Sequence, residues 1–469
     1  MKKHIAIDLG ATSGRIIVGD LKELEVIHRF ESFNEKLGDS YYWAIIKIFS
    51  EIKEGLSLAF KKYGEQIVSI AIDGWGVDYA LLDESKSLIS PIYHYRDPRN
   101  NKSVKEIVTL FESEFKLWEE TGNAISTYNT IFQLASTKRE RKNLFDIAKY
   151  YLSIPDYIAY LLSNVISNER SEASTTALFD SSTNDWNYDL IEKINIPKSI
   201  FTKPVESGTI LGELTDDLKK EFNINHSVSI IACATHDTAS AISIIEDNSI
   251  YISSGTWSLI GTNLIEKSLS KLTFDGGFTN ECGINNDITL VKNVMGMWIS
   301  NSVIKEKLGD NVNWAELDKA TIKALDYEGL IDPLDDIYLT PSSSDNTMSD
   351  RVKNQLIDKG FREPSSIEEY LVAIYRGLSD VYRKSIIELE EITNKKYDKL
   401  FIVGGGSKNQ ILNKLTSDIC NISVQAGPVE ATAIGNILVQ AKALNLIDSI
   451  EKGRKIINEN YYSIIYDPN

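Results

Sequence analysis

Four short segments of the chain end an apolar run with glycines, hydroxyl side chains or an acidic residue. They are residues 5–15 (IAIDLGATSGR), 235–238 (THDT), 252–257 (ISSGTW) and 402–407 (IVGGGS). A turn rich in glycine or hydroxyl residues at a strand end exposes backbone N–H groups that bind phosphate oxygens. A carboxylate beside such a turn can hold a divalent cation or accept a proton. Together the four segments indicate chemistry on a phosphate group.

The first segment has the composition of a phosphate-binding hairpin turn. Gly10 and Gly14 allow backbone conformations that other residues avoid. Thr12 and Ser13 add hydroxyl donors, and Asp8 at the strand end is placed to orient a hydrated Mg²⁺. The segment is not a P-loop, because the chain contains no GxxxxGK[ST] motif. A hairpin turn that faces solvent and binds nothing explains the same residues.

The 235–238 segment places a carboxylate where a helix is expected to begin. Asp237 follows the apolar run 228–232 and precedes the run 238–245, so its anion lies near the positive end of the helix dipole. A carboxylate in the wall of a cleft can accept the proton of an attacking hydroxyl, as phosphoryl transfer requires. N-capping of the helix by an aspartate is the simpler alternative.

Three further segments suit the binding of a nucleotide and a sugar. The glycine run 404–406 weakens regular structure, so it favours a flat turn on which adenine or ribose can lie, although a loop that only starts a helix is the alternative. Residues 75–78 (WGVD) and 95–99 (YRDPR) combine aromatic rings with paired charges, as sugar sites do. Surface ion pairing accounts equally well for Arg96 and Arg99.

The elements that must position these segments alternate between strands and helices. In the first half we predict a hairpin from the runs 5–7 and 15–20, a helix over 42–60 and a buried strand over 67–72. The second half repeats the theme with a hairpin at 250–253 and 257–261. It continues with a helix over 367–391, a strand over 400–403, a helix over 411–420, a strand over 422–424 and a helix over 430–444. Residues 180–187 and 332–350 are predicted loops.

This pattern predicts an α/β fold with mixed sheets and helices on both faces. The repeated hairpin indicates two related domains that face each other across a cleft. We expect the boundary between Ile242 and Ile250, which gives domains 1–245 and 246–469. The length of 469 residues also exceeds that at which a single core stops growing.

Composition excludes several partners. A net charge of −17 argues against nucleic acid and anionic membranes, but not against ATP held by amides and a metal ion. No apolar stretch approaches the length of a membrane span. Cys233, Cys282 and Cys420 lack CxxC spacing, which predicts no zinc site and no disulfide framework. We therefore expect an unexported, cytoplasmic protein.

In order and spacing, these segments resemble the FGGY-type carbohydrate kinases of the actin/Hsp70-like ATPase superfamily, and within that family most closely the rhamnulokinases. The resemblance spans nearly the whole chain. It is carried by DLGATSGR, GWGVDYALLD, YRDPRN, THDTAS, SSGTWSLIG, KNVMGMWI and IVGGGSKNQILNKLTSDIC. It implies two actin/Hsp70-like (ribonuclease H-like) ATPase domains that flank a central cleft.

The resemblance also implies a role for individual residues. Asp237 would be the catalytic base. The implied sugar contacts are Gly76, His236, Asp237, Thr238 and Asn293. The implied ATP contacts are Ala11, Thr12, Ser13, Gly14, Arg15, Thr256, Asn301, Gly404, Gly405 and Gly406. Asp8 would steer Mg²⁺.

The reaction implied is ATP-dependent phosphorylation of the primary hydroxyl of a ketose, with L-rhamnulose 1-phosphate from L-rhamnulose as the expected product in L-rhamnose catabolism. The enzyme would be a monomer or homodimer. Thr12 stands where the family has Ser, Gly74 where it has Thr, and Asn301 where we expect Gln. Gly74 neighbours the sugar, so the identity of the ketose stays open.

Three other functions stay open as well. The chain could phosphorylate another ketose or polyol, such as L-fuculose, D-xylulose or glycerol. It could be an actin-like ATPase that works as a chaperone or filament protein, although such proteins need no base like that of THDT. It could be a non-catalytic sugar sensor, which the full set of expected carboxylates disfavours.

Overall fold

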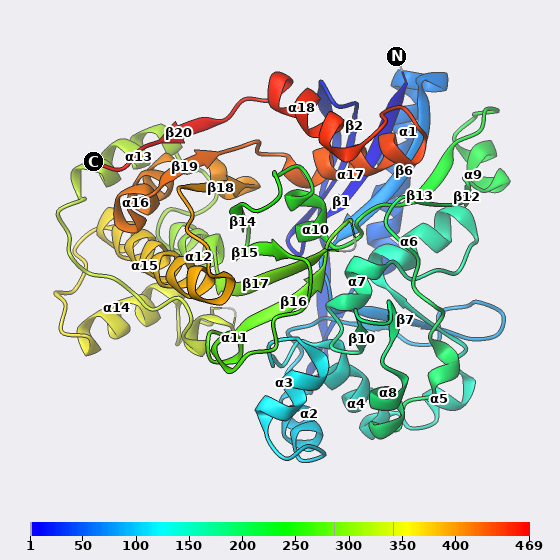
Figure 1. The fold of residues 1–469 in the computed structure, drawn as a ribbon, viewed down its shortest axis with the longest axis horizontal. Helices are drawn as coiled ribbons and strands as arrows, with labels where there is room; N and C mark the ends of the chain where they lie inside the picture. The colour runs from blue at the N-terminus through cyan, green and yellow to red at the C-terminus, as the bar shows by residue number, and fades with distance from the viewer. Residues whose placement is uncertain (1, 286, 341) are drawn as a thin grey trace.

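The chain folds around two large mixed β-sheets, one from each half of the sequence (Figure 1). The computed structural model describes residues 2–285, 287–340 and 342–469. The first sheet has the order β12 (Thr209–Glu213), β13 (Ser229–Ala232), β6 (Ile67–Gly74), β1 (Lys3–Leu9), β2 (Ser13–Gly19) and β3 (Leu24–Glu31). The second has the order β16 (Phe278–Cys282), β17 (Ile288–Met295), β15 (Trp257–Leu264), β14 (Ile250–Ser254), β18 (Lys399–Val403), β19 (Ser423–Ala426) and β20 (Ile464–Tyr466). The predicted α/β class is confirmed.

Helices and short strands surround the sheets. The helices of the first half are α1 (Ile45–Tyr63), α2 (Asn100–Val108), α3 (Glu114–Thr121), α4 (Thr130–Glu140), α5 (Leu144–Ile147), α6 (Ile154–Ser163), α7 (Arg170–Ser174), α8 (Tyr188–Lys193), α9 (Asp216–Glu221) and α10 (Asp237–Ile242). Those of the second half are α11 (Lys271–Asp275), α12 (Met297–Leu308), α13 (Trp314–Lys323), α14 (Met348–Asp358), α15 (Ile367–Thr393), α16 (Gln410–Cys420), α17 (Ala431–Ala443) and α18 (Ile450–Asn460). The short strands are β4 (Asn34–Leu37), β5 (Ser40–Trp43), β7 (Tyr79–Leu82), β8 (Ile92–Tyr93), β9 (Tyr150–Ser153), β10 (Phe179–Asp180) and β11 (Asp185–Trp186).

The two predicted hairpins form and occupy equivalent places in the two sheets. β1 pairs antiparallel with β2 and parallel with β6, and β14 pairs antiparallel with β15 and parallel with β18. In the first turn Gly10 N donates to Ser13 O at 3.1 Å, and in the second Gly255 N donates to Trp257 O at 2.7 Å. Each half therefore directs one tight turn from the end of a buried strand.

Three local predictions need correction. The helix predicted to include Tyr42 begins only at Ile45, because Tyr42 belongs to β5 and pairs with Tyr93 of β8. The predicted loop 180–187 contains the β10–β11 pair. The predicted loop 332–350 contains a short 3₁₀ helix (Asp336–Tyr338) and the start of α14, and the Tyr338 side chain is fully buried there. Residue 341 of that loop lies outside the described residues.

The two halves interlock through one helix and one strand. Helix α17, drawn in orange, comes from the second half but packs on α10 and on β1 and β6 of the first sheet (Figure 1). There Gln440 Nε2 donates to Ile5 O at 2.9 Å, and Asn436 Nδ2 donates to Asp73 at 2.6 Å. Strand β16 of the second sheet is held by the first half, because Asn280 N donates to Gly122 O at 2.8 Å. These contacts set the spacing of the walls between which the site lies.

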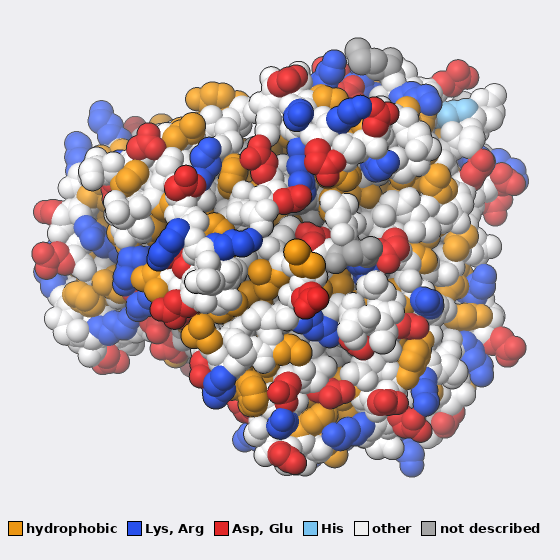
Figure 2. Space-filling view, viewed as in Figure 1, with side chains coloured by type: hydrophobic (Ala, Val, Ile, Leu, Met, Phe, Trp, Pro, Cys, Tyr) orange, Lys and Arg blue, Asp and Glu red, His pale blue; other side chains and the backbone are white. Residues whose placement is uncertain are grey.

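The surface carries both signs of charge. On the face in Figure 2, acidic and basic side chains are interspersed and hydrophobic ones are scattered among them. Over the part of the chain that the structure describes, no helix combines the length and apolarity needed to cross a membrane.

Candidate functional site

Three acidic residues gather at one edge of the first sheet because neighbouring parallel strands end there. The register of β1 and β6 pairs Asp8 with Asp73, and a parallel bridge pairs Gly74 with His236 just after β13. Asp237 follows as the first residue of α10, as the sequence predicted. Carboxylates far apart in the chain are therefore brought close together, although Asp73 is fully buried.

A cavity of about 340 Å³ lies over this edge, with walls from both halves of the chain. It contains all but three of the predicted site residues: Asp8, Ala11, Thr12, Ser13, Arg15, Gly76, His236, Asp237, Thr238, Thr256, Asn293, Gly404 and Gly405. Trp75, Tyr95, Tyr128, Trp257 and Glu281 also line it. The cavity is thus continuous from the two hairpin turns to a wall of aromatic rings.

Gly14, Gly406 and Asn301 do not line the cavity. A Cβ on Gly14 would lie 2.3 Å from the Phe30 ring, and one on Gly406 would lie 1.9 Å from Ser254 Oγ. These two glycines therefore permit close packing behind the turns. Asn301 is exposed on α12. Their predicted contacts with ATP stay predictions.

Backbone turns surround one end of the cavity, which we call the phosphate end. The Thr12 and Thr256 hydroxyl oxygens, one from each hairpin turn, are 3.4 Å apart. Gly404 follows β18 with φ +83, a conformation that glycine adopts readily, and Ser407 N donates back to Gly404 O at 3.1 Å. Two hairpin turns and the glycine turn therefore converge where phosphate oxygens could be held by N–H groups.

An ion-pair chain crosses the phosphate end. Arg15 donates to Asp8 of its own hairpin and to Glu430, which precedes α17 in the second half. Burial raises the pKa of Asp8 although the charge of Arg15 opposes the shift. Burial also raises the pKa of Asp73 well above its usual range, with Asp8 adding to the effect, and Asp73 Oδ1 has no hydrogen-bond partner among the described residues. This concentration of buried acid groups suits a bound cation.

The other end of the cavity, the sugar end, is organised by one buried carboxylate. Asp78 accepts hydrogen bonds from Trp43 Nε1 at 2.6 Å, Trp75 Nε1 at 3.1 Å and Gln133 Nε2 at 2.9 Å. The backbone N–H of Tyr95 donates to the same carboxylate at 3.2 Å. Burial raises the pKa of Asp78 to about 7 against these donors. Asp78 thereby fixes the rings of the N-terminal wall without lining the cavity itself.

Side chains from the two halves meet across the sugar end. Asn293 Nδ2 donates to Tyr128 Oη at 3.1 Å, and the Tyr128 ring lies 5.8 Å from that of Trp257. The Arg96 guanidinium lies 4.5 Å from the Trp298 ring of α12. Arg96 therefore stacks on the second half of the chain. Surface ion pairing, the alternative that the sequence allows for Arg96, is not its role here.

The Arg99 side chain, for which the sequence also allows surface ion pairing, is only 5% exposed and lies within the first half. Its guanidinium lies 3.4 Å from the Tyr93 ring, and Nη1 donates to Thr137 Oγ1 at 2.9 Å. The Glu140 carboxylate is 3.7 Å from the same nitrogen. Arg99 therefore holds the helices behind the sugar end together and does not line the cavity.

Asp237 occupies the junction between the two ends. Its side chain is 33% exposed, so a ligand in the cavity can reach it. Enclosure by protein raises its pKa to about 6, while the charge of His236 lowers it and that of Asp8 raises it. The carboxylate is therefore ionised at neutral pH and is a stronger base than a solvated aspartate.

The loop that carries Asp237 is anchored from behind by Glu169. This buried carboxylate accepts from Thr235 N at 3.1 Å and from Thr235 Oγ1 at 2.8 Å. Ser171 Oγ accepts from His236 N at 3.1 Å. The orientation of the base thus depends on the segment 169–171, which none of the predicted sites includes.

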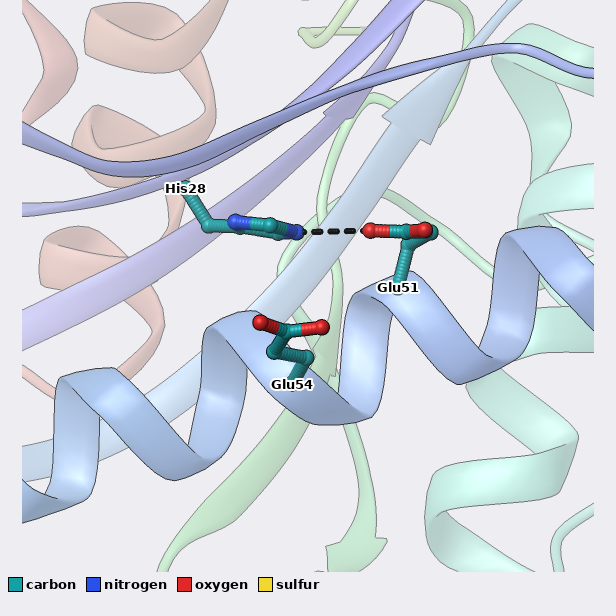
Figure 3. Close-up of side chains that lie close together, drawn as sticks. All are labelled: His28, Glu51 and Glu54. Carbon is teal, nitrogen blue, oxygen red and sulfur yellow. Dashed lines mark hydrogen bonds and ion pairs between the residues drawn. The ribbon is translucent and has the colours of Figure 1, made fainter.

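A second group of potential metal ligands lies outside the cavity, between β3 and α1 (Figure 3). The ligand atoms of His28, Glu51 and Glu54 lie within 4.8 Å of one another. His28 Nε2 and Glu51 Oε2 form a hydrogen bond of 2.9 Å, and Glu54 is exposed. That hydrogen bond accounts for the arrangement without a metal.

Three acids at or next to the site were not predicted: Glu281, which lines the cavity, and Asp73 and Glu430, which neighbour the lining residues Asp8 and Arg15. Asp73 carries a usable signal, since it ends an apolar run as Asp8 does. Glu281 has none, because residues 278–282 (FTNEC) form no apolar run and the burial of this strand is seen only in the fold. Glu430 has none, because its contact with Arg15 depends on how the two halves interlock.

Comparison with known proteins agrees with this geometry. Residues 4–243 match the N-terminal domain of the FGGY family of carbohydrate kinases, and residues 250–444 match its C-terminal domain. A rhamnulokinase from Oceanobacillus iheyensis is 35% identical over 464 residues, 98% of this chain and 97% of the relative. One from Bacillus subtilis is 32% identical over 99% of this chain and 95% of the relative.

Solved structures resemble the whole chain. A ligand-bound xylulose kinase from Lactobacillus acidophilus has a TM-score of 0.80 at 15% identity, over 100% of this chain and 94% of that one. A glycerol kinase from Plasmodium falciparum with ADP has a TM-score of 0.78 at 15% identity, with the same coverage. The chain belongs to the FGGY family of carbohydrate kinases. It is a carbohydrate kinase with the two-domain fold of the actin/Hsp70-like ATPases.

Proposed function

We propose that the protein transfers the γ-phosphoryl group of ATP to the primary hydroxyl of a ketose, and that the ketose is L-rhamnulose. The observation that carries the proposal is the place of Asp237, between the hairpin turns and the aromatic sugar end of one cavity. The substrate is inferred from the relatives named rhamnulokinase, which match nearly the full chain. The product would be L-rhamnulose 1-phosphate.

In this reaction Asp237 accepts the hydroxyl proton as the sugar oxygen bonds to the γ-phosphorus. The bond from that phosphorus to the bridging oxygen breaks, and ADP leaves with the electron pair. His236, Thr238, Gly76 and Asn293 would orient the sugar. Backbone N–H groups of the turns at 10–14 and 255–256, with Gly404 and Gly405, would hold the phosphates and the nucleotide.

The residues at the phosphate end fit Mg²⁺. Asp8 lines the cavity there, and the buried Asp73 beside it in the sheet has a carboxylate oxygen without a hydrogen-bond partner among the described residues. Hard cations prefer such ligands and keep much of their hydration and phosphate contacts. When bound, Mg²⁺ would neutralise charge on the transferred phosphoryl group.

Three further expectations, on domain bounds, location and oligomeric state, belong to the proposal as well. The domain division would be 1–245 and 246–469, the location cytoplasmic, and the protein a monomer or homodimer. Met1 of the first range lies outside the described residues. Size-exclusion chromatography with light scattering measures the oligomeric state directly.

The deciding experiment is a coupled ADP-release assay with purified protein over L-rhamnulose, L-fuculose, D-xylulose, glycerol and their isomers. We expect the highest kcat/KM with L-rhamnulose and slow ADP release without sugar. A preference for another member of the panel would replace the substrate and keep the class of enzyme. Fast ATP hydrolysis that no sugar stimulates would favour the actin-like ATPase alternative.

A further inference from the structure

Glu281 is a charged residue in an otherwise buried strand. All five residues of β16 are buried, and the Glu281 side chain is only 8% exposed. Such a carboxylate is costly unless a cation compensates it. Among the described residues, its ion-pair partner is His236, on the loop that carries the base. Glu281 comes from the second half and His236 from the first.

The His236 ring lies between two carboxylates. Its Nδ1 is 3.2 Å from Glu281 Oε2, an ion-pair contact that is not aligned as a hydrogen bond. Its Nε2 is 3.6 Å from Asp237 Oδ1. One imidazole thus contacts the base of the proposed reaction with one nitrogen and a buried glutamate with the other. All three residues line the cavity.

The backbone fixes Glu281 in place. Ala124 N donates to Thr279 Oγ1 at 2.8 Å, and Cys282 N donates to Ser174 Oγ at 2.8 Å. These bonds hold β16 to the first half on both sides of Glu281. On the other side of the pair, Ser171 Oγ fixes the backbone of His236. The separation of Glu281 and His236 is therefore set by the fold.

We propose that Glu281 is a positioning residue that acts through His236, holding the imidazole charged and turned toward Asp237 so that the base stays ionised inside the closed cavity. The inference rests on the proposed function and deepens it. Removal of water makes every charge in the cavity interact more strongly, so a fixed cation beside the base matters most there. Without it, the acid groups nearby would favour a protonated Asp237.

The signs of the interactions agree with this role. Burial lowers the pKa of His236, but the charges of Glu281 and Asp237 outweigh it, so the net shift is upward. His236 is in turn the main influence that lowers the pKa of Asp237. Acids act on this pair from the surrounding elements, namely Glu281, Glu169, Asp8, Asp73 and Glu172. Two arginines also line the cavity, Arg15 on β2 and Arg29 on β3, and Arg15 is paired with Asp8 and Glu430. Among the described residues, His236 is the cation that forms an ion-pair contact with Asp237.

The test is the pH dependence of kcat/KM for Glu281→Gln. In the wild type we expect activity to fall as the pH drops through about 6, where Asp237 takes up a proton. In the variant the pKa of His236 should fall, because burial is then opposed by one acid fewer, and this acid limb should move up by about one pH unit. A shift of that size costs about fivefold at pH 6 and almost nothing at pH 8.5. Glu281→Asp keeps a carboxylate, so it should bring this limb of the pH profile part of the way back to its wild-type position.

Two controls separate this role from loss of structure. Glu388→Gln removes the carboxylate partner of Lys292 on the adjacent strand β17, away from the cavity, and should leave the limb in place. In the double variant with His236→Asn, Glu281→Gln should produce no further shift, because its effect passes through the imidazole. An equal loss at all pH values, or additive shifts in the double variant, would overturn the proposal.

A second measurement needs neither the variant nor turnover. The chain has five histidines, so NMR titration of histidine-labelled protein can resolve the His236 ring. We expect the pKa of His236 to lie above that of a solvated histidine. A His236 pKa below that of a solvated histidine would reject the proposed action of Glu281 through His236, even if every variant failed to fold. A wild type inactive on all sugars would instead reject the proposed function and leave the titration interpretable.

Discussion

The two ends of the cavity are built in different ways. At the phosphate end, Asp8 and Asp73 lie near the ends of paired buried strands and strand register brings them together, while the 255–256 turn ends the equivalent hairpin of the second sheet. At the sugar end, Tyr128 meets Asn293 and Glu281 meets His236 only because β16 and α17 interlock the halves. The first arrangement follows from local pattern and strand pairing, and the second from tertiary packing. We therefore expect phosphate-end variants to change kcat and metal dependence, and sugar-end variants to change ketose KM.

Asp237→Asn should have the largest effect, because Asp237 lies where the two ends meet. The substitution keeps the shape but removes the base, so kcat should fall about 10²–10⁴-fold with ATP affinity little changed. The coupled ADP-release assay measures kcat, and nucleotide titration measures ATP affinity. Asp217→Asn, an exposed carboxylate at the start of α9, is the control. Activity within a few-fold of wild type would place the base elsewhere.

Asp8→Ala tests the phosphate end alone. We expect kcat to fall about tenfold or more, equal to at least 1.4 kcal/mol of barrier, and the Mg²⁺ requirement to rise. Ketose KM should change little, because the Asp8 side chain pairs with Arg15 and, among the described residues, forms no hydrogen bond or ion pair with the aromatic wall. Asp20→Ala removes the Lys3 partner at the other end of the same hairpin and serves as the control. A normal kcat with an unchanged Mg²⁺ titration would make Asp8 a structural residue.

Asp78→Asn tests the sugar end alone. The new amide turns a donor toward either the indole and Tyr95 N–H groups or the Gln133 amide, so the free energy of unfolding should fall by about 1–3 kcal/mol. The displaced rings should raise ketose KM about threefold to tenfold, or about 1 kcal/mol, with kcat and Mg²⁺ dependence nearly unchanged. Steady-state kinetics and thermal unfolding measure both.

Gln355→Leu is the matched control for Asp78→Asn. Gln355 accepts hydrogen bonds from Asp332 N and Tyr338 Oη in the second half and does not line the cavity. This variant should lose stability but keep its KM for the ketose. If Asp78→Asn lowered kcat more than it raised KM, the division of labour between the two ends would be wrong.

The difference between the ends also explains what the sequence could predict. Strand-end motifs are local, so Asp8, the hairpin turns and Asp237 were recoverable from apolar runs and glycines. The start of α1 was misplaced because Tyr42 satisfies helical spacing yet pairs with Tyr93, a contact that hydrophobic periodicity does not contain. Glu281, Glu430 and the stacking of Arg96 on Trp298 depend on how the halves meet. Local patterns in the sequence carry no information on how the two halves meet.

The smallest expected effect concerns motion of the two halves of the chain, which form the opposite walls of the cleft. Opening the cleft must separate the Thr12–Thr256 contact and the Arg15–Glu430 ion pair, which join the hairpin turns and α17 across the phosphate end. The α10–α17 packing and the bonds that hold β16 can persist when α17 pivots, so that Glu430 at its start moves away from Arg15 while its later turns stay in place. Ligands that touch both halves favour the closed state, which also excludes water from the phosphate.

Small-angle scattering should therefore show a slightly smaller radius of gyration with ketose and a non-hydrolysable ATP analogue than without ligand. Glu430→Gln should enlarge this difference, because it removes one contact that holds the empty cleft shut. The variant should also keep its kcat within a few-fold, since Glu430 neither accepts the proton nor contacts the ring wall. Identical curves at saturating ligand, in active protein and in the variant, would mean that the interlocked halves do not open. The contacts across the cleft would then persist in every state of the enzyme, and the ligands would have to enter a site already formed.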